Sequence, residues 1–335
     1  MHIARWDLDK TYLRTEFDSL RDIVKTALER PDQKRTNPGA STLLREMVRA
    51  GVRVHILSGS PEQMRRRLED KLRLDGITWD SFTLKPNLQN VLRLRFRAVR
   101  DQLGYKLPAL LRARARLAET GEPASAGTET LFGDDAEADA YVYSLYADFV
   151  AGRVGEDVLL HVLELGRVYE DVVAEAMQTA RAIEHADVVE RILIHLEQQT
   201  PPDDFRTYGP RVVPFYNYLQ AAFVLHEDER LGPDGVLRVA VELVTEHRFD
   251  GDALARSYLD LARRGHLRGV REEALGAALD AWLTQGQVPA SDELRAMVAR
   301  LPAMAEGARA SWHEREQPMP DYEALVEGHN LRRRK

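Results

Sequence analysis

Residues 5–13 read RWDLDKTYL and place two aspartates, Asp7 and Asp9, one residue apart near the start of the chain. The residues before them, HIARW, are typical of a short strand that ends at Asp7. A carboxylate is costly to bury, because its charged form loses its hydration. The pair therefore indicates either a solvated turn after the strand or a site in which the charges are used.

Strand and helix patterns alternate from this stretch to about residue 150. The apolar residues of TLLREMVRAG, 42–51, have helical spacing, and VRVHILSGS, 52–60, is typical of a buried strand. GITWDSFTL (76–84) is a weaker strand candidate, LPALLRARARLAE (107–119) a helix, and ETLFGDD (129–135) a further strand. This alternation predicts an α/β fold with a doubly wound parallel sheet, in which functional groups gather at the carboxyl ends of the strands.

Strand signals fade after about residue 155. The segments ADVVERILIHLEQQ (186–199) and VPFYNYLQAAFVLHE (213–227) have helix-like patterns, as does most of the remaining sequence. We therefore expect one domain over residues 1–152 and an all-helical domain over 153–335. The second domain would serve as a lid, a homo-oligomer interface or a platform for a protein partner. His185 and His195 are expected to be solvated side chains on helices.

The composition narrows the classes of function. A net charge of −7 argues against nucleic acid as a partner, and the absence of cysteine excludes disulfides and cysteine-based sites. The start, MHIARWDLDK, lacks the apolar core of a signal peptide, and no apolar run reaches the length of a membrane span. We therefore expect a cytoplasmic protein without a transmembrane segment.

Small or acidic polar residues follow three of the predicted strands. They are Asp7 and Asp9, then Ser58 and Ser60, then Asp134, Asp135 and, one helical turn later, Asp139. If the strands are neighbours, these side chains converge on one crevice, where clustered carboxylates need a cation. Oxygen ligands without His or Cys favour Mg²⁺.

Two of the residues have alternative interpretations. Ser60, followed by Pro61, is predicted to cap a helix, and Asp135 is either a helix cap or a metal ligand.

The ordered set resembles the motifs of the haloacid dehalogenase (HAD) superfamily, which implies a Rossmann-like, HAD-type sheet. WDLDKT resembles its first motif, VHILSGS its second and LFGDDAEAD its fourth. Lys106, in LGYKLPALL and 28 positions before Asp134, resembles the lysine of the third motif; Lys85, 49 positions before Asp134, is the rival. LSGSP, DGITWDSFTL and YKLPALL are most similar to the catalytic domain of actin-patch type phosphatidate phosphatases and their bacterial relatives. Lys10 and Thr11 depart from that subfamily, which usually reads Asp-Thr after the second aspartate.

The resemblance implies roles for individual residues. Asp7 would be the nucleophile that forms an aspartyl-phosphate, and Asp9 the general acid and base. Ser58 would bind the transferring phosphoryl group, and Lys106 would offset negative charge. Mg²⁺ would be held by Asp7, the backbone carbonyl of Asp9 and Asp134, with Asp139 or Asp135 nearby.

The implied activity is that of a Mg²⁺-dependent phosphomonoester hydrolase, because a dehalogenase does not need an acid at the position of Asp9. The substrate is open between a small phosphorylated molecule and a phospholipid. Two alternatives remain: a non-catalytic interaction protein that binds phosphate or a partner, and a phosphotransferase whose acceptor is not water.

Overall fold

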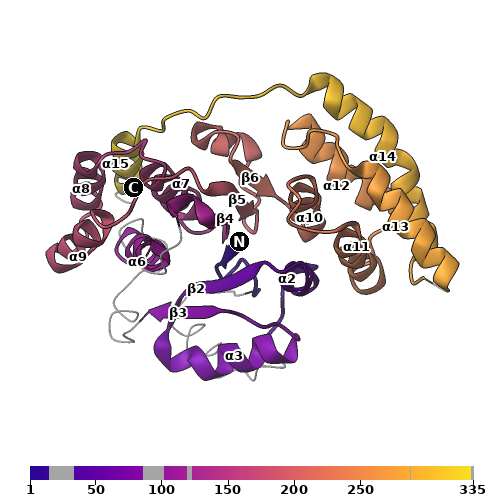
Figure 1. Ribbon diagram of the computed structural model, residues 1–335, viewed down its shortest axis with the longest axis horizontal. Coiled ribbons are helices and arrows are strands. Elements are labelled where there is room, and N and C mark those ends of the chain that lie inside the picture. The colour runs from indigo at the N-terminus through magenta and orange to yellow at the C-terminus, as the bar shows by residue number, and fades with distance from the viewer. Residues whose placement is uncertain (15–33, 86–101, 119–122, 287, 333–335) are drawn as a thin grey trace.

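Six parallel strands form one sheet in the part of the chain that the structure, a computed structural model, describes: residues 1–14, 34–85, 102–118, 123–286 and 288–332. The strands are β1 (His2–Trp6), β2 (Arg53–Pro61), β3 (Ser81–Lys85), β4 (Thr128–Asp134), β5 (Val189–His195) and β6 (Val212–Phe215). Their order across the sheet is β3-β2-β1-β4-β5-β6 (Figure 1). The fold is therefore α/β and Rossmann-like, as the alternation of strands and helices predicted.

The chain reverses its direction of travel across the sheet beside β1. It proceeds outward through β2 and β3 and then returns to the other side of β1 to form β4. Trp6, the last residue of β1, lies opposite Ile56 of β2 and Phe132 of β4. In such sheets ligands bind outside the carboxyl ends of the strands at this switch point. The residues that follow Trp6 and Phe132 are therefore at the expected place for a site.

Helices cover both faces of the sheet (Figure 1). One apolar core packs against α2 (Ala40–Arg49), η2 (Glu62–Met64), α3 (Arg65–Leu74), α10 (Tyr218–Glu227), α11 (Pro233–His247), α12 (Gly251–Arg263), α13 (Glu272–Gln285) and α14 (Ser291–Ser311). The other packs against α6 (Lys106–Ala118), α7 (Asp139–Val150), α8 (Glu156–Leu165), α9 (Glu170–Ala180), η4 (Pro202–Tyr208) and α15 (Tyr322–Arg332), while η3 (Ala124–Ala126) precedes β4. The central strands are covered on both sides, which is why β1 is buried along its whole length.

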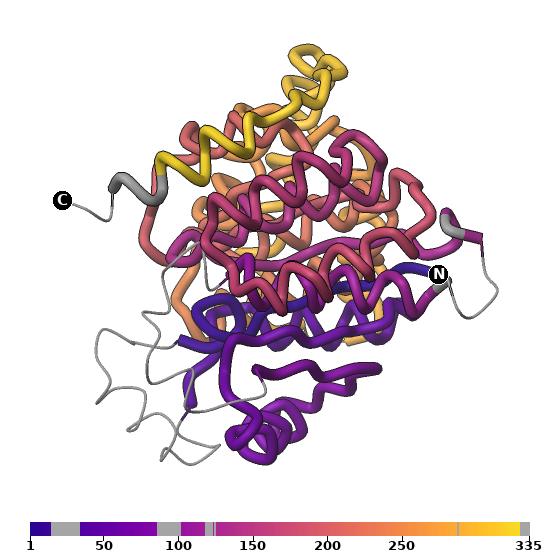
Figure 2. Tube along the Cα trace, turned by 90° about the vertical axis from the view of Figure 1, so that its left-hand side faces the viewer, coloured from indigo at the N-terminus to yellow at the C-terminus, as the bar shows by residue number. Residues whose placement is uncertain are grey.

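An extended segment of residues 312–321 links the two helical layers. It leaves α14 and runs over the molecule to α15, which packs against α8 (Figures 1 and 2). Tyr322 anchors the start of α15, because its hydroxyl donates to Asp148 at 2.5 Å and its carbonyl accepts from the Tyr141 hydroxyl at 2.9 Å. We call residues 312–321 the connecting segment.

The four strands predicted up to residue 135 are present, although the one predicted over 76–84 begins only at Ser81. The helices predicted over 42–51 and 107–119 correspond to α2 and α6, and residue 119 lies outside the described residues. The prediction of an all-helical segment from 153 onward is wrong, because 186–199 contains β5 and 213–227 begins with the end of β6. The predicted boundary at residue 152 thus separates four strands of the sheet from the other two.

The misprediction has a physical cause. Ile192, Leu193 and Ile194 of β5 are fully buried, because helices cover both faces of this strand. Such a strand is a continuous apolar run without alternation, and its Val189-to-Leu193 spacing also fits a helix. The β6 strand has four residues, and Asn217, whose side chain accepts from the Gln220 amide, starts α10 just beyond it.

Among the described residues, no helix combines the length and the apolar character needed to cross a membrane.

Candidate active site

The two aspartates of the opening stretch lie at the carboxyl end of β1 in different surroundings. The Asp7 amide continues the sheet by donating to the Phe132 carbonyl at 3.0 Å, and the side chain is 1% exposed. The chain then turns sharply, with Lys10 in the left-handed region at φ 60°. Asp9 is half-buried. One tight loop therefore presents two carboxylates to two separate groups of partners.

Asp9 is held by two hydroxyl groups from the end of β2. Its Oδ2 accepts from Ser58 Oγ at 3.0 Å and from Ser60 Oγ at 2.7 Å. The prediction that Ser60 caps a helix is wrong: β2 continues through Ser60 to Pro61, and η2 begins without a side-chain cap. Burial raises the pKa of Asp9, while the two serine hydroxyls lower it by stabilising the charged form. Asp9 is therefore suited to carry a proton at a higher pH than an ordinary carboxyl.

Asp7 belongs to an acidic cluster that β4 and the following turn complete. Carboxylate oxygens of Asp7, Asp134, Glu137 and Asp139 all lie within 4.8 Å of one another. Asp134 ends β4, and its Oδ1 accepts from the amides of Ala136 at 2.6 Å and Glu137 at 3.0 Å, which folds the chain back onto the cluster. Glu137 was missed by the sequence analysis, although its place one turn after Asp134 was the available signal.

Gly133 makes room for this arrangement. A Cβ atom at this position would come within 2.4 Å of Asp139 Oδ2. Asp139 Oδ2 accepts from the Asp134 amide at 3.2 Å, so the side chain lies directly over the backbone of β4. The glycine in GDD therefore permits Asp139 to reach the strand end.

Lys106, at the start of α6, is the cation of the cluster. Its Nζ donates to Asp139 at 2.5 Å and to Glu137 at 2.9 Å, and it lies 3.6 Å from Asp7 Oδ1. Lys106 is fully buried, and the three carboxylates raise its pKa well above the ordinary value despite that burial. Lys85 is instead placed with its Nζ 5.8 Å from the centre of the Tyr105 ring. Of the two candidate lysines, Lys106 is the one that contacts the cluster.

The cluster carries more negative charge than Lys106 can balance. Burial raises the pKa of Asp7 and of Asp134 well above the ordinary value, and neighbouring carboxylates add to both shifts. Burial also raises the pKa of Asp139, to about 6. In addition, Asp7 Oδ1 is buried and has no hydrogen-bond partner among the described residues. An oxygen-only donor set with a buried carboxylate atom that accepts no hydrogen bond fits a hard divalent cation such as Mg²⁺.

Residues from β5 and α10 hold the loop that carries the two aspartates. The Lys10 carbonyl accepts from the Asn37 side chain at 2.9 Å and lies 3.2 Å from His195 Nδ1. The Thr11 carbonyl accepts from Asn37 at 2.7 Å and from the Tyr218 hydroxyl at 2.5 Å. Sequence reasoning missed all three side chains, because their contacts depend on the tertiary fold.

His195 is buried, so the prediction of a solvated side chain is wrong. Burial lowers its pKa to about 4, which keeps the ring neutral near pH 7. Because a carbonyl only accepts hydrogen bonds, Nδ1 must carry the proton to bind the Lys10 carbonyl. His195 therefore acts as a fixed donor to the loop.

Asp135 is neither a helix cap nor a member of the cluster. Its carboxylate accepts from the amides of Gln198 at 2.8 Å and Thr200 at 2.9 Å, which fixes the chain that leaves β5. The helix α7 begins after Ala138 without a side-chain cap. Both alternatives weighed for Asp135 are therefore replaced by a third role.

A scan against protein-family models, a search of curated proteins and a search of solved structures found no match to this chain.

Proposed function

We propose that the protein is a Mg²⁺-dependent phosphomonoester hydrolase of the HAD type, with Asp7 as nucleophile and Asp9 as general acid and base. The observation that carries this proposal is the division of one Asp-x-Asp pair between two environments. Asp7 lies beside Lys106 in the acidic cluster, whereas Asp9 is half-buried between two serine hydroxyls. A pair used for one purpose, such as metal binding alone, would not need this separation.

In the first step, an oxygen of the Asp7 carboxylate attacks the phosphorus atom of the substrate. The new P–O bond to Asp7 forms as the P–O bond to the leaving alcohol breaks, and Asp9 donates its proton to the leaving oxygen. The raised pKa of Asp9 supports this role, because burial favours the protonated carboxyl. The products of the step are the alcohol, an aspartyl-phosphate and an ionised Asp9.

In the second step, Asp9 accepts a proton from water as the water oxygen attacks phosphorus. The P–O bond to Asp7 breaks, which restores the carboxylate and releases inorganic phosphate, and Asp9 is again protonated. Ser58 and Ser60 stabilise the ionised Asp9 between the two steps through their hydrogen bonds to Oδ2.

A divalent cation would be held by Asp7 and Asp134, with Asp139 and Glu137 beside them. When bound, it would offset the negative charge of the phosphoryl group next to the Asp7 carboxylate. Lys106 keeps Asp139 and Glu137 oriented and adds a positive charge 3.6 Å from Asp7 Oδ1. Thr11 Oγ1 donates to Asp7 Oδ2 at 3.3 Å and so restricts the orientation of the nucleophile.

The substrate class that we propose is a phosphomonoester, either of a small molecule or of a phospholipid. Release of phosphate from sugar, nucleotide and lipid monophosphates distinguishes these sources. Water is proposed as the acceptor; a phosphotransferase would form a phosphorylated acceptor in place of free phosphate.

The test is hydrolysis of p-nitrophenyl phosphate by the full chain with Mg²⁺ and after chelation with EDTA. We expect turnover that depends on Mg²⁺ and that Asp7→Asn lowers by about 10³-fold or more, because the amide cannot act as the nucleophile. The matched control is Asp292→Asn, which makes the same change on a side chain that is 89% exposed.

Equal inactivity of the wild type and Asp7→Asn across the whole panel of monophosphates would overturn the proposal. If both proteins nevertheless bound inorganic phosphate, the alternative of a non-catalytic phosphate-binding protein would replace it.

A further inference from the structure

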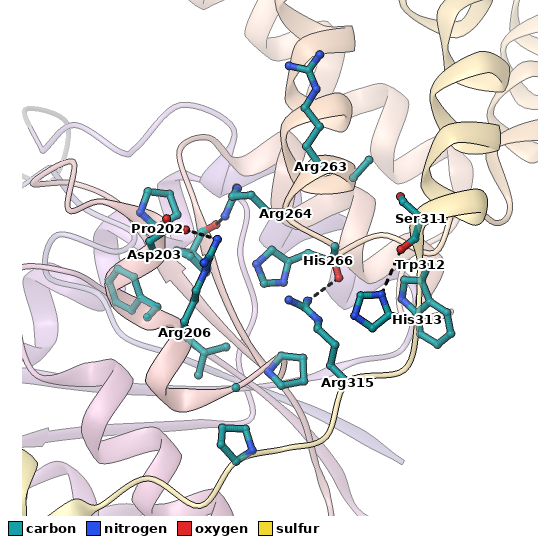
Figure 3. A pocket seen from close by; sticks show the side chains of 18 of the residues that line it. Pro202, Asp203, Arg206, Arg263, Arg264, His266, Ser311, Trp312, His313 and Arg315 are labelled. Carbon is teal, nitrogen blue, oxygen red and sulfur yellow. Dashed lines mark hydrogen bonds and ion pairs between the residues drawn. The ribbon is translucent and has the colours of Figure 1, made fainter.

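A cavity lies at the β6 edge of the sheet and shares no residue with the acidic cluster. Its volume is about 520 Å³, within the usual range for sites that bind small molecules. Its walls come from η4, from the end of α12 with the turn after it, and from the connecting segment (Figure 3). Three parts of the chain that are distant in sequence thus enclose it.

The lining of the cavity is basic. It contains four arginines, against two carboxylates from Asp203 and Glu316. The arginines are Arg206, Arg263, Arg264 and Arg315. This surplus of positive charge favours an anionic ligand.

Two of the arginines already have acidic partners. Arg264 binds Asp260 and donates to the Pro214 carbonyl at 2.6 Å, and Arg206 lies 2.8 Å from Asp203. Arg315 differs from them: its guanidinium donates to the Gly265 carbonyl at 2.7 Å and forms no ion pair with the described residues. Arg315 therefore has donors and a charge to offer to a ligand.

His266 supplies a second unsatisfied group next to Arg315. Its Nδ1 is buried and has no hydrogen-bond partner among the described residues. Figure 3 shows the ring between Arg264 and Arg315 on the wall of the cavity. A buried polar atom without a partner is destabilising unless a ligand or water satisfies it.

The pKa shifts of His266 and Arg315 also indicate a surplus of positive charge in the cavity. Burial lowers the pKa of His266 well below its ordinary value, and the charges of Arg264 and Arg315 lower it further. Burial also lowers the pKa of Arg315, and the nearby charge of Arg206 adds to that effect. An anion in the cavity would relieve the repulsion between these positive charges.

We propose that this cavity binds a small organic phosphate that carries a planar ring, with the phosphate between Arg315 and His266 and the ring against Trp312. A guanidinium binds phosphate oxygens with two parallel hydrogen bonds, and the imidazole beside it offers a further polar group to the phosphate. Trp312 lines the cavity and is 42% exposed, so its ring offers a flat apolar surface for stacking. A nucleoside monophosphate has this combination of groups. The cavity is a binding site separate from the proposed hydrolysis, and its existence does not depend on that activity.

The experiment is calorimetric titration of the full chain with AMP in EDTA, together with adenosine, ribose 5-phosphate and inorganic phosphate. EDTA prevents the Mg²⁺-dependent turnover proposed for the other site. We expect AMP to bind about tenfold or more tightly than each of the three fragments, because only AMP fills both halves of the cavity. Affinity should fall as the salt concentration rises.

Substitutions of single residues test whether AMP binds in this cavity. Arg315→Gln should weaken binding by about tenfold or more, and Arg315→Lys should recover part of it because the charge remains. The matched control is Arg66→Gln, which removes the same charge from an exposed arginine on α3 that does not line the cavity. It should stay within about twofold of the wild type, as should Asp7→Asn.

Failure of AMP to bind at millimolar concentration would overturn the proposal. An equal loss in Arg66→Gln and Arg315→Gln would also overturn it, because binding would then reflect general attraction to a basic surface. A loss in Asp7→Asn would place the AMP in the acidic cluster. Inorganic phosphate binding as tightly as AMP would remove the contact with Trp312 from the proposal.

Discussion

At the scale of the residue, Asp7 and Asp9 have the same side chain and differ only in their partners. Lys106 and three carboxylates surround Asp7, while Ser58 and Ser60 bind Asp9. Asp7 and Asp9 could be predicted from sequence because they follow β1, and the two serines because they lie at the carboxyl end of β2, whereas Lys106 was identified through its resemblance to a family motif. Glu137 could not be found in this way, because it reaches the cluster through a turn that the Asp134 carboxylate itself stabilises.

Because Asp7 and Asp9 have different proposed roles, replacing each by Asn should block a different step of the reaction. In Asp9→Asn the amide cannot accept a proton from water, so the second step should slow by about 10²- to 10⁴-fold. With p-nitrophenyl phosphate, whose leaving group departs without needing a proton, the first step is slowed less and the aspartyl-phosphate should accumulate. Intact-protein mass spectrometry after mixing with substrate and Mg²⁺ should detect one covalent phosphate in Asp9→Asn and none in Asp7→Asn. Full turnover in Asp9→Asn would contradict the assignment.

The acidic cluster makes stability depend on pH in a specific direction. Because the pKa of Asp139 is raised to about 6, the folded chain binds this proton more tightly than the unfolded chain does. The contribution to stability is complete below the ordinary carboxyl pKa and is lost as the pH rises through about 6. Asp139→Asn imitates the protonated form, so without metal it should gain stability over the wild type, on the order of 1 kcal/mol, at about pH 8.

Urea denaturation in EDTA at about pH 5 and about pH 8 measures this difference. The advantage of the variant should be small at the lower pH and larger at the higher one. Added Mg²⁺ should stabilise the wild type more than Asp139→Asn. If the stability gained by Asp139→Asn over the wild type became smaller as the pH rises, the predicted direction of the pH dependence would be wrong.

At the scale of the element, β5 and α10 complete a site whose reactive groups come from β1, β2 and β4. His195 ends β5 and Tyr218 begins α10, and both donate to carbonyls of the loop after β1. The place where the reactive side chains gather was predictable from sequence, whereas the hydrogen bonds from His195 and Tyr218 to their loop were not. A strand buried on both faces has the apolar pattern of a buried helix, so β5 gave no separate signal.

Tyr218→Phe tests whether the loop depends on this support. The change removes one hydrogen bond to the Thr11 carbonyl and keeps the ring that stacks with Trp6 at 5.8 Å. We expect a loss of about 1 kcal/mol in the free energy of unfolding and a lower kcat with little change in KM, because the aspartates are held less firmly.

The control for Tyr218→Phe is the same change at Tyr169, which is 63% exposed. Denaturant unfolding and steady-state kinetics of the two variants provide the comparison. If Tyr218→Phe kept the stability and kcat of the wild type, the loop would be rigid without it.

At the scale of the whole molecule, the sheet joins residues on both sides of position 152. The β4 and β5 strands are neighbours along their length, and Asp134 lies opposite His195 in their register. A chain ending at residue 152 would expose the whole edge of β4 and lose two side chains, His195 and Tyr218, that hold the loop with the two aspartates. Exposed edges of this kind promote aggregation.

We therefore predict that a fragment of residues 1–152 does not form the active structure. It should lack cooperative unfolding and phosphatase activity, and size-exclusion chromatography should show aggregated material. The full chain, prepared in parallel, is the control. A monomeric fragment with the activity of the full chain would show that the first four strands are sufficient.

The hydrogen bond between Tyr218 and the Thr11 carbonyl also determines when the loop of the two aspartates can be completed during synthesis. The two residues are 207 positions apart, which a ribosome covers in about 10–40 seconds at roughly 5–20 residues per second. Asp7, the proposed nucleophile, is therefore made well before Tyr218, whose hydroxyl holds its loop. During that interval a nascent chain carries both aspartates without this contact.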